Sequence, residues 1–88
     1  MLTKVVKLEI VAPHGLRVQF NTGEQGVHDC RSLIQEAGSL VQPLRDPGYF
    51  ARAFLEFGAP TWPNGFDMEP EWLRREMAAA GELSAAAA

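Results

Sequence analysis

The sequence has little of the residue chemistry from which catalytic and metal sites are usually built. It contains one cysteine, Cys30, and two histidines among 88 residues. A single cysteine excludes an internal disulfide and a zinc cage made of thiolates. No catalytic, metal or nucleotide motif is present, so we expect neither a cofactor nor a metal. The residues favour a non-catalytic protein and leave enzyme activity open.

Long runs of basic residues and of apolar residues are also missing. The chain carries 8 basic and 11 acidic residues, a formal net charge of −3, and its longest basic run is Arg74-Arg75. Binding to a nucleic-acid backbone needs several lysine or arginine contacts, so we do not expect this chain alone to bind nucleic acid. No apolar stretch approaches the length of a membrane span, and the charged residues 1–7 do not resemble a signal peptide. We therefore predict a cytoplasmic protein that does not enter a membrane.

The chain does have an ordinary globular composition in a length that suits one domain. Hydrophobic residues make up 47% of the sequence, which argues against wholesale disorder. Residues 1–81 are predicted to form one domain, followed by a flexible alanine-rich tail over residues 82–88. A domain this short buries a modest fraction of its surface, so we expect marginal stability. A homodimer would be more stable, although the composition does not require one.

Alternation of apolar and polar residues predicts strands in the first third of the chain. Residues 4–12 and 16–20 each show a period of two, typical of strands with one buried face. The residues expected on the buried face of the first strand are Val6, Leu8, Ile10 and Ala12. Residues 21–23, Asn-Thr-Gly, predict a hairpin turn into a weaker third strand over residues 24–29. Gly26 in that strand indicates a bulge or a close approach of another backbone segment.

Capping residues predict two short helices in the middle of the chain. Asp29 is placed to cap a helix over residues 30–37, which Gly38 would end. Asp46 followed by Pro47 has the order of an N-cap and a first helical position, so a short helical turn is expected there.

The C-terminal half predicts two further strands and the longest helix. A fourth strand is expected around residues 53–57 and a short edge strand at residues 61–62, since Pro60 cannot donate a ladder hydrogen bond. Pro70 then starts an amphipathic helix that Gly81 ends. The aromatic residues expected in the core are Tyr49, Phe50, Phe54 and Phe57. Together the elements predict an α+β domain, with a small, mainly antiparallel sheet of four to five strands and two or three short helices packed against it.

The most specific local pattern is the segment 62–70, WPNGFDMEP. We expect Trp62 to pack in the core, Asn64 to turn the chain, and Asp67 to order the turn by accepting backbone N–H bonds. The same side chains could instead form a polar and aromatic binding surface, together with Arg45 and Asp46, which precede Pro47. The candidate interaction surface consists of Arg45, Asp46, Trp62, Asn64 and Asp67.

One other set of residues could support nucleophilic chemistry: His14, His28, Asp29 and Cys30. If the second and third strands pair around residues 21–23, His14 falls opposite or diagonal to His28 and Asp29. A catalytic cysteine needs a base within hydrogen-bond reach and a third group that orients the base. A lone cysteine is more often a small buried residue, and the histidine spacing matches no recognised metal motif. This set remains an alternative basis for small-molecule binding or weak enzyme activity.

The order of these features resembles a known family. The residues that carry the resemblance are Val27-His28-Asp29, Pro43-Leu44-Arg45-Asp46, Phe50, Trp62-Pro63-Asn64-Gly65, Asp67, Pro70, Glu71 and Leu73. From about residue 5 to residue 73 the chain is similar to the small bacterial proteins called domain of unknown function 2442. The resemblance implies an α+β fold with a mainly antiparallel sheet, and no established catalysis. Members of the family look like partners of a second small protein encoded beside them, as in a toxin–antitoxin pair.

Three functions therefore stand open from the sequence. The favoured one is a protein-interaction module, the antitoxin-like partner of a small protein encoded by an adjacent gene, because an acidic domain with an edge strand could pair with another chain. The second is a small-molecule-binding protein or weak enzyme that uses the His14, His28, Asp29 and Cys30 region. The third is an accessory protein for nucleic-acid binding.

Overall fold

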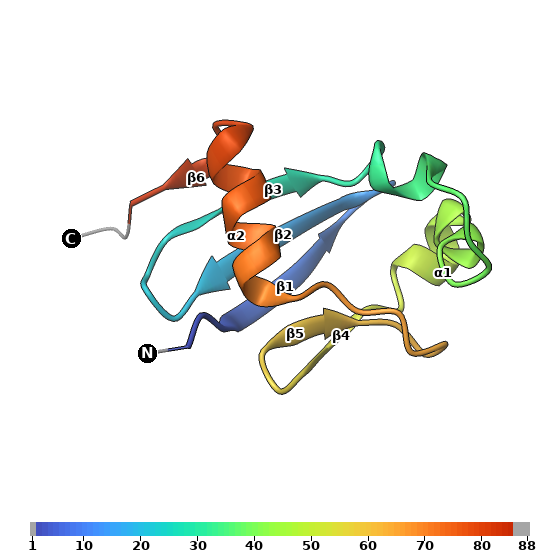
Figure 1. Ribbon diagram of the computed structural model, residues 1–88, viewed down its shortest axis with the longest axis horizontal. Coiled ribbons are helices and arrows are strands. Elements are labelled where there is room, and N and C mark those ends of the chain that lie inside the picture. The colour runs from blue at the N-terminus through green and yellow to red at the C-terminus, as the bar shows by residue number, and fades with distance from the viewer. Residues whose placement is uncertain (1, 86–88) are drawn as a thin grey trace.

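Two small antiparallel sheets and one longer helix enclose the core of the protein (Figure 1). The computed structural model describes residues 2–85. The larger sheet has the strand order β1-β2-β3-β6, formed by Val5–Val11, Gly15–Phe20, Gln25–Asp29 and Leu83–Ser84. The smaller sheet pairs β4, Phe54–Glu56, with β5, Ala59–Thr61. The predicted α+β class with a mainly antiparallel sheet is confirmed.

Four helical segments complete the fold of residues 2–85, and all but the last have three or four residues. Two are 3-10 helices, η1 (Leu33–Gln35) and η2 (Gln42–Arg45), and two are α-helices, α1 (Pro47–Phe50) and α2 (Pro70–Ala79). Helix α2 lies across one face of the larger sheet (Figure 1). None of the helices within residues 2–85 is long and apolar enough to cross a membrane.

The predicted starts of both α-helices are confirmed by their caps. The Asp46 carboxylate accepts a hydrogen bond from the Tyr49 N–H at 3.1 Å, with Pro47 at the first helical position of α1. The Glu69 carboxylate accepts from the backbone N–H groups of Glu71 and Trp72 at 3.1 and 2.8 Å at the start of α2. Each cap satisfies donors that the first helical turn leaves without partners.

The first hairpins follow the predicted alternation except at Val6 and at Ala12, which is exposed in the turn after β1. Leu16, Val18 and Phe20 of β2 are all buried, and β2 pairs antiparallel with β3 as expected. In β1 the register shifts between Val5 and Lys7, a β-bulge that changes which side chains face the core. Val6 is therefore 49% exposed instead of buried.

The helix expected over residues 30–37 is wrong. Only the 3-10 helix η1 forms there. The Asp29 carboxylate accepts from the Arg31 N–H at 3.0 Å, as a cap would, and also binds the Arg31 guanidinium. Cys30, at 0% exposure, is drawn into the core, and its N–H bonds to the His14 carbonyl across the sheet. One α-helical hydrogen bond forms, from the Ile34 N–H to the Cys30 carbonyl at 3.1 Å, and the chain then continues with 3-10 bonds until Glu36 becomes extended, so no longer helix develops.

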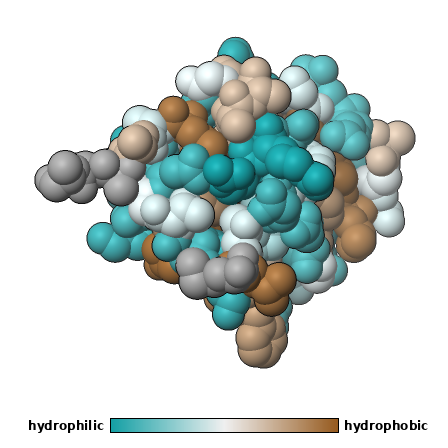
Figure 2. Space-filling view, turned by 60° about the vertical axis from the view of Figure 1, so that its left-hand side comes forward, coloured by the Kyte–Doolittle hydropathy of each residue, from teal (hydrophilic) through white to brown (hydrophobic). Residues whose placement is uncertain are grey.

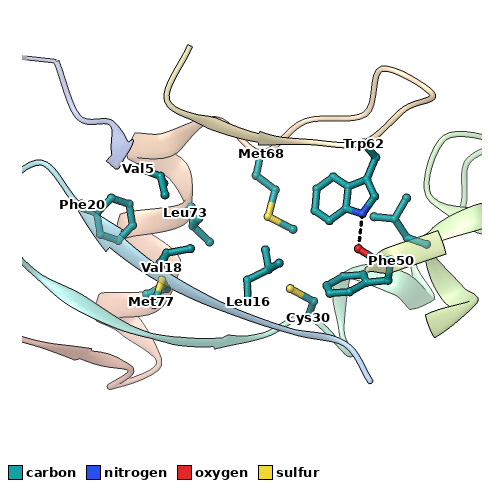
Figure 3. Packing of buried hydrophobic residues seen from close by; sticks show 11 residues of the cluster. Val5, Leu16, Val18, Phe20, Cys30, Phe50, Trp62, Met68, Leu73 and Met77 are labelled. Atoms are coloured by element: carbon teal, nitrogen blue, oxygen red, sulfur yellow. Dashed lines mark hydrogen bonds between the residues drawn. The ribbon is translucent and has the colours of Figure 1, made fainter. Parts of the chain in front are cut away.

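The core lies between α2, the larger sheet and the segment that follows β5 (Figure 3). Its fully enclosed side chains include Leu16, Val18, Phe20, Cys30, Leu44, Phe50, Trp62, Leu73 and Met77. Two aromatic residues expected there are exposed: Phe54 is 45% exposed and Phe57 is 94% exposed. Phe57 lies just past the end of β4, in the turn to β5, so strand alternation does not apply to it.

Part of the expected C-terminal tail is a strand. Leu83–Ser84 form β6, which pairs with β3 at Gln25 and Gly26. A Cβ atom at Gly26 would lie 1.9 Å from the Glu82 carbonyl oxygen, so the close backbone approach predicted at this glycine is confirmed. Residues 86–88 of the expected tail lie outside the described residues.

Candidate functional site

Asn64 organises the conspicuous turn after β5. Its side-chain amide donates to the Leu40 carbonyl at 3.0 Å, and its side-chain oxygen accepts from the Phe66 N–H at 3.1 Å. Its backbone N–H donates to the Tyr49 hydroxyl at 3.0 Å. The turn is thereby tied to the loop before η2 and to α1, so the backbone N–H and both polar side-chain atoms of Asn64 have a structural role.

Asp67 does not have the role that its position suggested. Within residues 2–85 no hydrogen bond reaches its carboxylate, which lies on an exposed residue, while its backbone bridges to Thr61. The prediction that Asp67 orders the turn is therefore wrong, and Asn64 does so instead. Asp67 is a solvent-facing acid beside the turn.

Trp62 cannot belong to an interaction surface. It is 0% exposed, and its indole N–H donates to the Phe50 carbonyl at 2.9 Å inside the core. The expectation that Trp62 packs in the core is confirmed, and its alternative role on a binding surface is wrong. A fully enclosed side chain has no surface left for a partner.

Arg45 and Asp46 are exposed, yet both serve the local fold. The Arg45 guanidinium donates to the carbonyl oxygens of Ile34 and Glu36 at 2.6 and 3.2 Å. Asp46 caps α1 and does not pair with Arg45. These contacts hold the loop around η1 against η2.

The structure brings His14, His28, Asp29 and Cys30 to one end of the larger sheet without forming a catalytic arrangement. His28 pairs through Nδ1 with the Glu82 carboxylate at 2.7 Å. The Nε2 atom of His14 lies 2.9 Å from the Arg45 carbonyl oxygen. Neither histidine ring is bonded to the cysteine sulfur, whose contact is the His28 carbonyl at 3.9 Å.

The Cys30 thiol is also unsuited to nucleophilic chemistry. Burial, with the nearby Asp29 and Glu82 carboxylates, raises the pKa of Cys30 to about 12. The reactive form of cysteine is the thiolate, which is scarce at neutral pH when the pKa is so high. Among residues 2–85 no group of three His, Cys, Asp or Glu side chains is placed to hold a metal ion.

The feature that sequence reasoning missed is an apolar projection at the tip of the β4–β5 hairpin. Phe57 has φ 51° and Gly58 has φ 80°, so two left-handed residues form the turn. In Figure 2 an apolar knob projects from the lower end of the molecule, the end at which this hairpin lies in Figure 1. The neighbouring Leu2 is 79% exposed. In the sequence, Gly58 and Pro60 indicate a turn here, but no pattern indicates that Phe57 is exposed.

A hollow of about 360 Å³ lies beside the projection. It is lined by Leu2, Thr3, Lys4, Phe57, Glu69, Pro70 and Glu71. The Thr3 hydroxyl donates to the Glu71 carboxylate, which joins the N-terminal segment to the start of α2. We call this region, Leu2 and Phe57 with the adjoining hollow, the hairpin-tip surface.

Comparison with known proteins gives one match. A family model described as "Protein of unknown function (DUF2442)" matches residues 5–78 of the chain. The match runs from the start of β1 into the last turn of α2 and includes the turn at Asn64. Neither the curated proteins nor the solved structures gave a match.

Proposed function

The chain belongs to the DUF2442 family of proteins of unknown function, and we propose that it is a non-catalytic protein-interaction module. In this proposal it is the antitoxin-like partner of a small protein encoded by an adjacent bacterial gene. The observation that carries the proposal is Phe57, an aromatic side chain that is 94% exposed on a left-handed backbone.

Neither packing nor backbone preference explains a phenylalanine at this position. A left-handed conformation costs a residue with a Cβ about 1–2 kcal/mol relative to the right-handed one. A nearly fully exposed ring recovers almost nothing through burial in the isolated chain. Glycine would suit the position better on both counts. Large aromatic side chains of this kind are typical anchors in protein interfaces.

Charge near the hairpin-tip surface indicates the kind of partner. Glu69 and Glu71 line the hollow and Glu56 ends β4, whereas Lys4 is the one basic residue among the described residues that line the hollow. The chain as a whole carries a net charge of −3. A partner with an apolar pocket for Phe57 and a basic rim would be complementary to this surface.

The site geometry supports binding over chemistry. The buried Cys30 with its raised pKa and the separately bonded His14 and His28 leave no nucleophile and base in contact. A protein-interaction role needs only a stable surface, which the caps and the turn at Asn64 provide.

Co-expression with the product of the adjacent gene tests the proposal. We expect the two proteins to co-elute in size-exclusion chromatography. The variant Phe57→Gly should weaken binding at least tenfold while raising the stability of the free chain by about 1 kcal/mol, since glycine accepts the left-handed backbone. If the Phe57 ring instead had a structural role, Phe57→Gly would lower the stability of the free chain.

Leu40→Ser is the matched control, because Leu40 is 48% exposed in the loop before η2, outside the hairpin-tip surface. It should leave binding unchanged. Separate elution of the wild-type proteins at micromolar concentration would end the pairing idea. If Phe57→Gly binds the partner as tightly as the wild type, the hairpin-tip surface is not the binding surface.

A further inference from the structure

Strand β1 is complementary to itself when two copies are aligned antiparallel. Its sequence is VVKLEIV, in which Lys7 and Glu9 stand on either side of Leu8. We infer that this protein forms a homodimer in which β1 pairs antiparallel with β1 of a second copy, about a two-fold axis at Leu8. The two larger sheets then join into one. The inference goes beyond the proposed function and uses a different surface from the hairpin tip.

One edge of β1 is open for such pairing. In the larger sheet β1 is the terminal strand; within residues 2–85 its one ladder partner is β2, while the β4–β5 hairpin packs beside it. An unpaired strand edge presents N–H and C=O groups that can bond to another chain. At its start the edge is closed, because the Val5 N–H donates to the Gly58 carbonyl at 2.8 Å. The open part therefore begins at Val6.

The hydrogen-bond pattern of β2 shows where its own backbone groups point. The Phe20 N–H donates to the Glu24 carbonyl, on the β3 side of the strand. Backbone groups alternate in direction along a strand, so those of Gln19 and Arg17 point toward β1.

The register then identifies the free groups of β1. Gln19 pairs with Lys7 and Arg17 pairs with Glu9, so the backbone groups of Lys7 and Glu9 are bonded to β2. The N–H and C=O groups of Leu8 therefore point away from β2, to the open edge. A two-fold axis at Leu8 would pair these groups with those of the Leu8 of the second copy.

Side chains across the new seam are complementary in this register. Lys7 lies opposite the second copy's Glu9, and Leu8 lies opposite its counterpart. Opposite charges facing each other on adjacent strands are favourable, and like charges are unfavourable. Moving the axis to Lys7 or to Glu9 would set like charges opposite each other. The charge order therefore selects the axis at Leu8.

Two apolar side chains next to this edge are exposed in the isolated chain. A hollow of about 560 Å³ lies over the larger sheet next to this edge, lined by residues 6–9 of β1, by Arg17, Gln19 and Gln25 of β2 and β3, and by residues 53–55 at β4. Val6 and Phe54 are 49% and 45% exposed in the isolated chain. A second copy of β1 paired along this edge would cover part of this apolar surface, which the fold leaves open to water.

Charge reversal on the full chain tests the inference. In size-exclusion chromatography with light scattering, the wild-type protein should have the mass of two chains, against 9.7 kDa for one. Lys7→Glu and Glu9→Lys should each weaken the dimer at least tenfold, because each sets like charges opposite each other. An equimolar mixture of the two variants should dimerise again, as should the double variant, because both restore opposite charges.

Arg17→Gln is the control for Glu9→Lys, since the Glu9 side chain also pairs with Arg17 at 2.8 Å within the chain. It removes that pair without changing β1 and should leave the dimer intact. A wild-type protein that stays monomeric up to submillimolar concentration would overturn the inference. A dimer that neither charge reversal weakens would also overturn the inference. So would the finding that a segment of another protein pairs with this edge of β1.

Discussion

The indole N–H of Trp62 donates a hydrogen bond to the carbonyl oxygen of Phe50, 2.9 Å away inside the core (Figure 3). The two rings also pack against each other, with centroids 5.5 Å apart. This contact joins the residue after β5 to the last residue of α1. It fixes the short helix, which has little stability of its own, to the centre of the domain.

Replacing Trp62 with phenylalanine should therefore destabilise the protein by about 2–4 kcal/mol, through a lost buried hydrogen bond and a partly unfilled cavity. Urea unfolding followed by circular dichroism measures the change. Trp72→Phe is the control, since Trp72 lies on α2 at the border of the core. This substitution should lower the free energy of unfolding by less than about 1 kcal/mol. Equal costs at both positions would contradict the central role of Trp62.

The turn after β5 gives a second prediction, which separates Asn64 from Asp67. Asn64→Ala removes the side-chain bonds to Leu40 and Phe66 and should cost about 1–2 kcal/mol in the free energy of unfolding. Asp67→Ala removes a solvent-facing carboxylate and should change stability by less than about 0.5 kcal/mol. Chemical denaturation of both variants measures the difference. A larger loss for Asp67→Ala would restore the role that its position in the sequence suggested.

Gly26→Ala should separate β6 from β3. The new Cβ would meet the Glu82 carbonyl oxygen at 1.9 Å, so one of the strands must move, at a cost of about 1–3 kcal/mol. The Asp29 N–H, bonded to the Glu82 carboxylate at 3.0 Å, should then exchange faster with deuterium.

Gly48→Ala is the control for this change, because its Cβ would have its nearest neighbour at 3.4 Å and the backbone is ordinary. It should leave the exchange of the Asp29 N–H as it is in the wild type. If the Asp29 N–H of Gly26→Ala exchanges at the wild-type rate, the pairing of β6 with β3 does not depend on the close approach at Gly26.

Stability should fall in acid partly through Glu24, which links the β2–β3 turn to α2. Its carboxylate accepts from the Arg74 guanidinium at 2.7 Å, and this bond, helped by Thr22, lowers the pKa of Glu24 below its ordinary value of 4.5. A lowered pKa in the folded state means stabilisation that is complete above pH 4.5 and lost as the pH falls through the folded value.

Glu24→Gln should therefore be less stable than the wild type near neutral pH and converge with it in acid. Denaturant midpoints across this pH range test the expectation. Arg74→Gln should show the same convergence, and the double variant should lose little more than either single one. A constant gap between Glu24→Gln and the wild type at every pH would contradict the ion-pair explanation.

Several elements follow from the sequence alone because short-range contacts form them. The turn after Phe20, the cap of Asp46 on α1 and the start of α2 at Pro70 each depend on a few adjacent residues. Local sterics and side-chain hydrogen bonds favour these conformations before any distant segment arrives. For the same reason the burial of β2 could be predicted from its alternation.

The candidate site could be predicted only in part, because exposure and partner choice are decided by distant segments. The sequence indicated that Trp62 and Asn64 matter, yet only the packed structure shows Trp62 enclosed and Asn64 bonded to Leu40. Phe57 reads as a core residue by its spacing, but the turn into β5 sends it into solvent.

The sequence by itself determined the fold class and the position of its main turns and α-helices. Only the tertiary structure decided that residues 30–37 form no full helix, that Leu83–Ser84 join the sheet, and that β1 keeps an open edge. Each of these depends on contacts between segments far apart along the chain, such as Cys30 with His14 and Glu82 with His28. Such contacts cost chain entropy to form and are specified by the whole core, so no local sequence pattern predicts them.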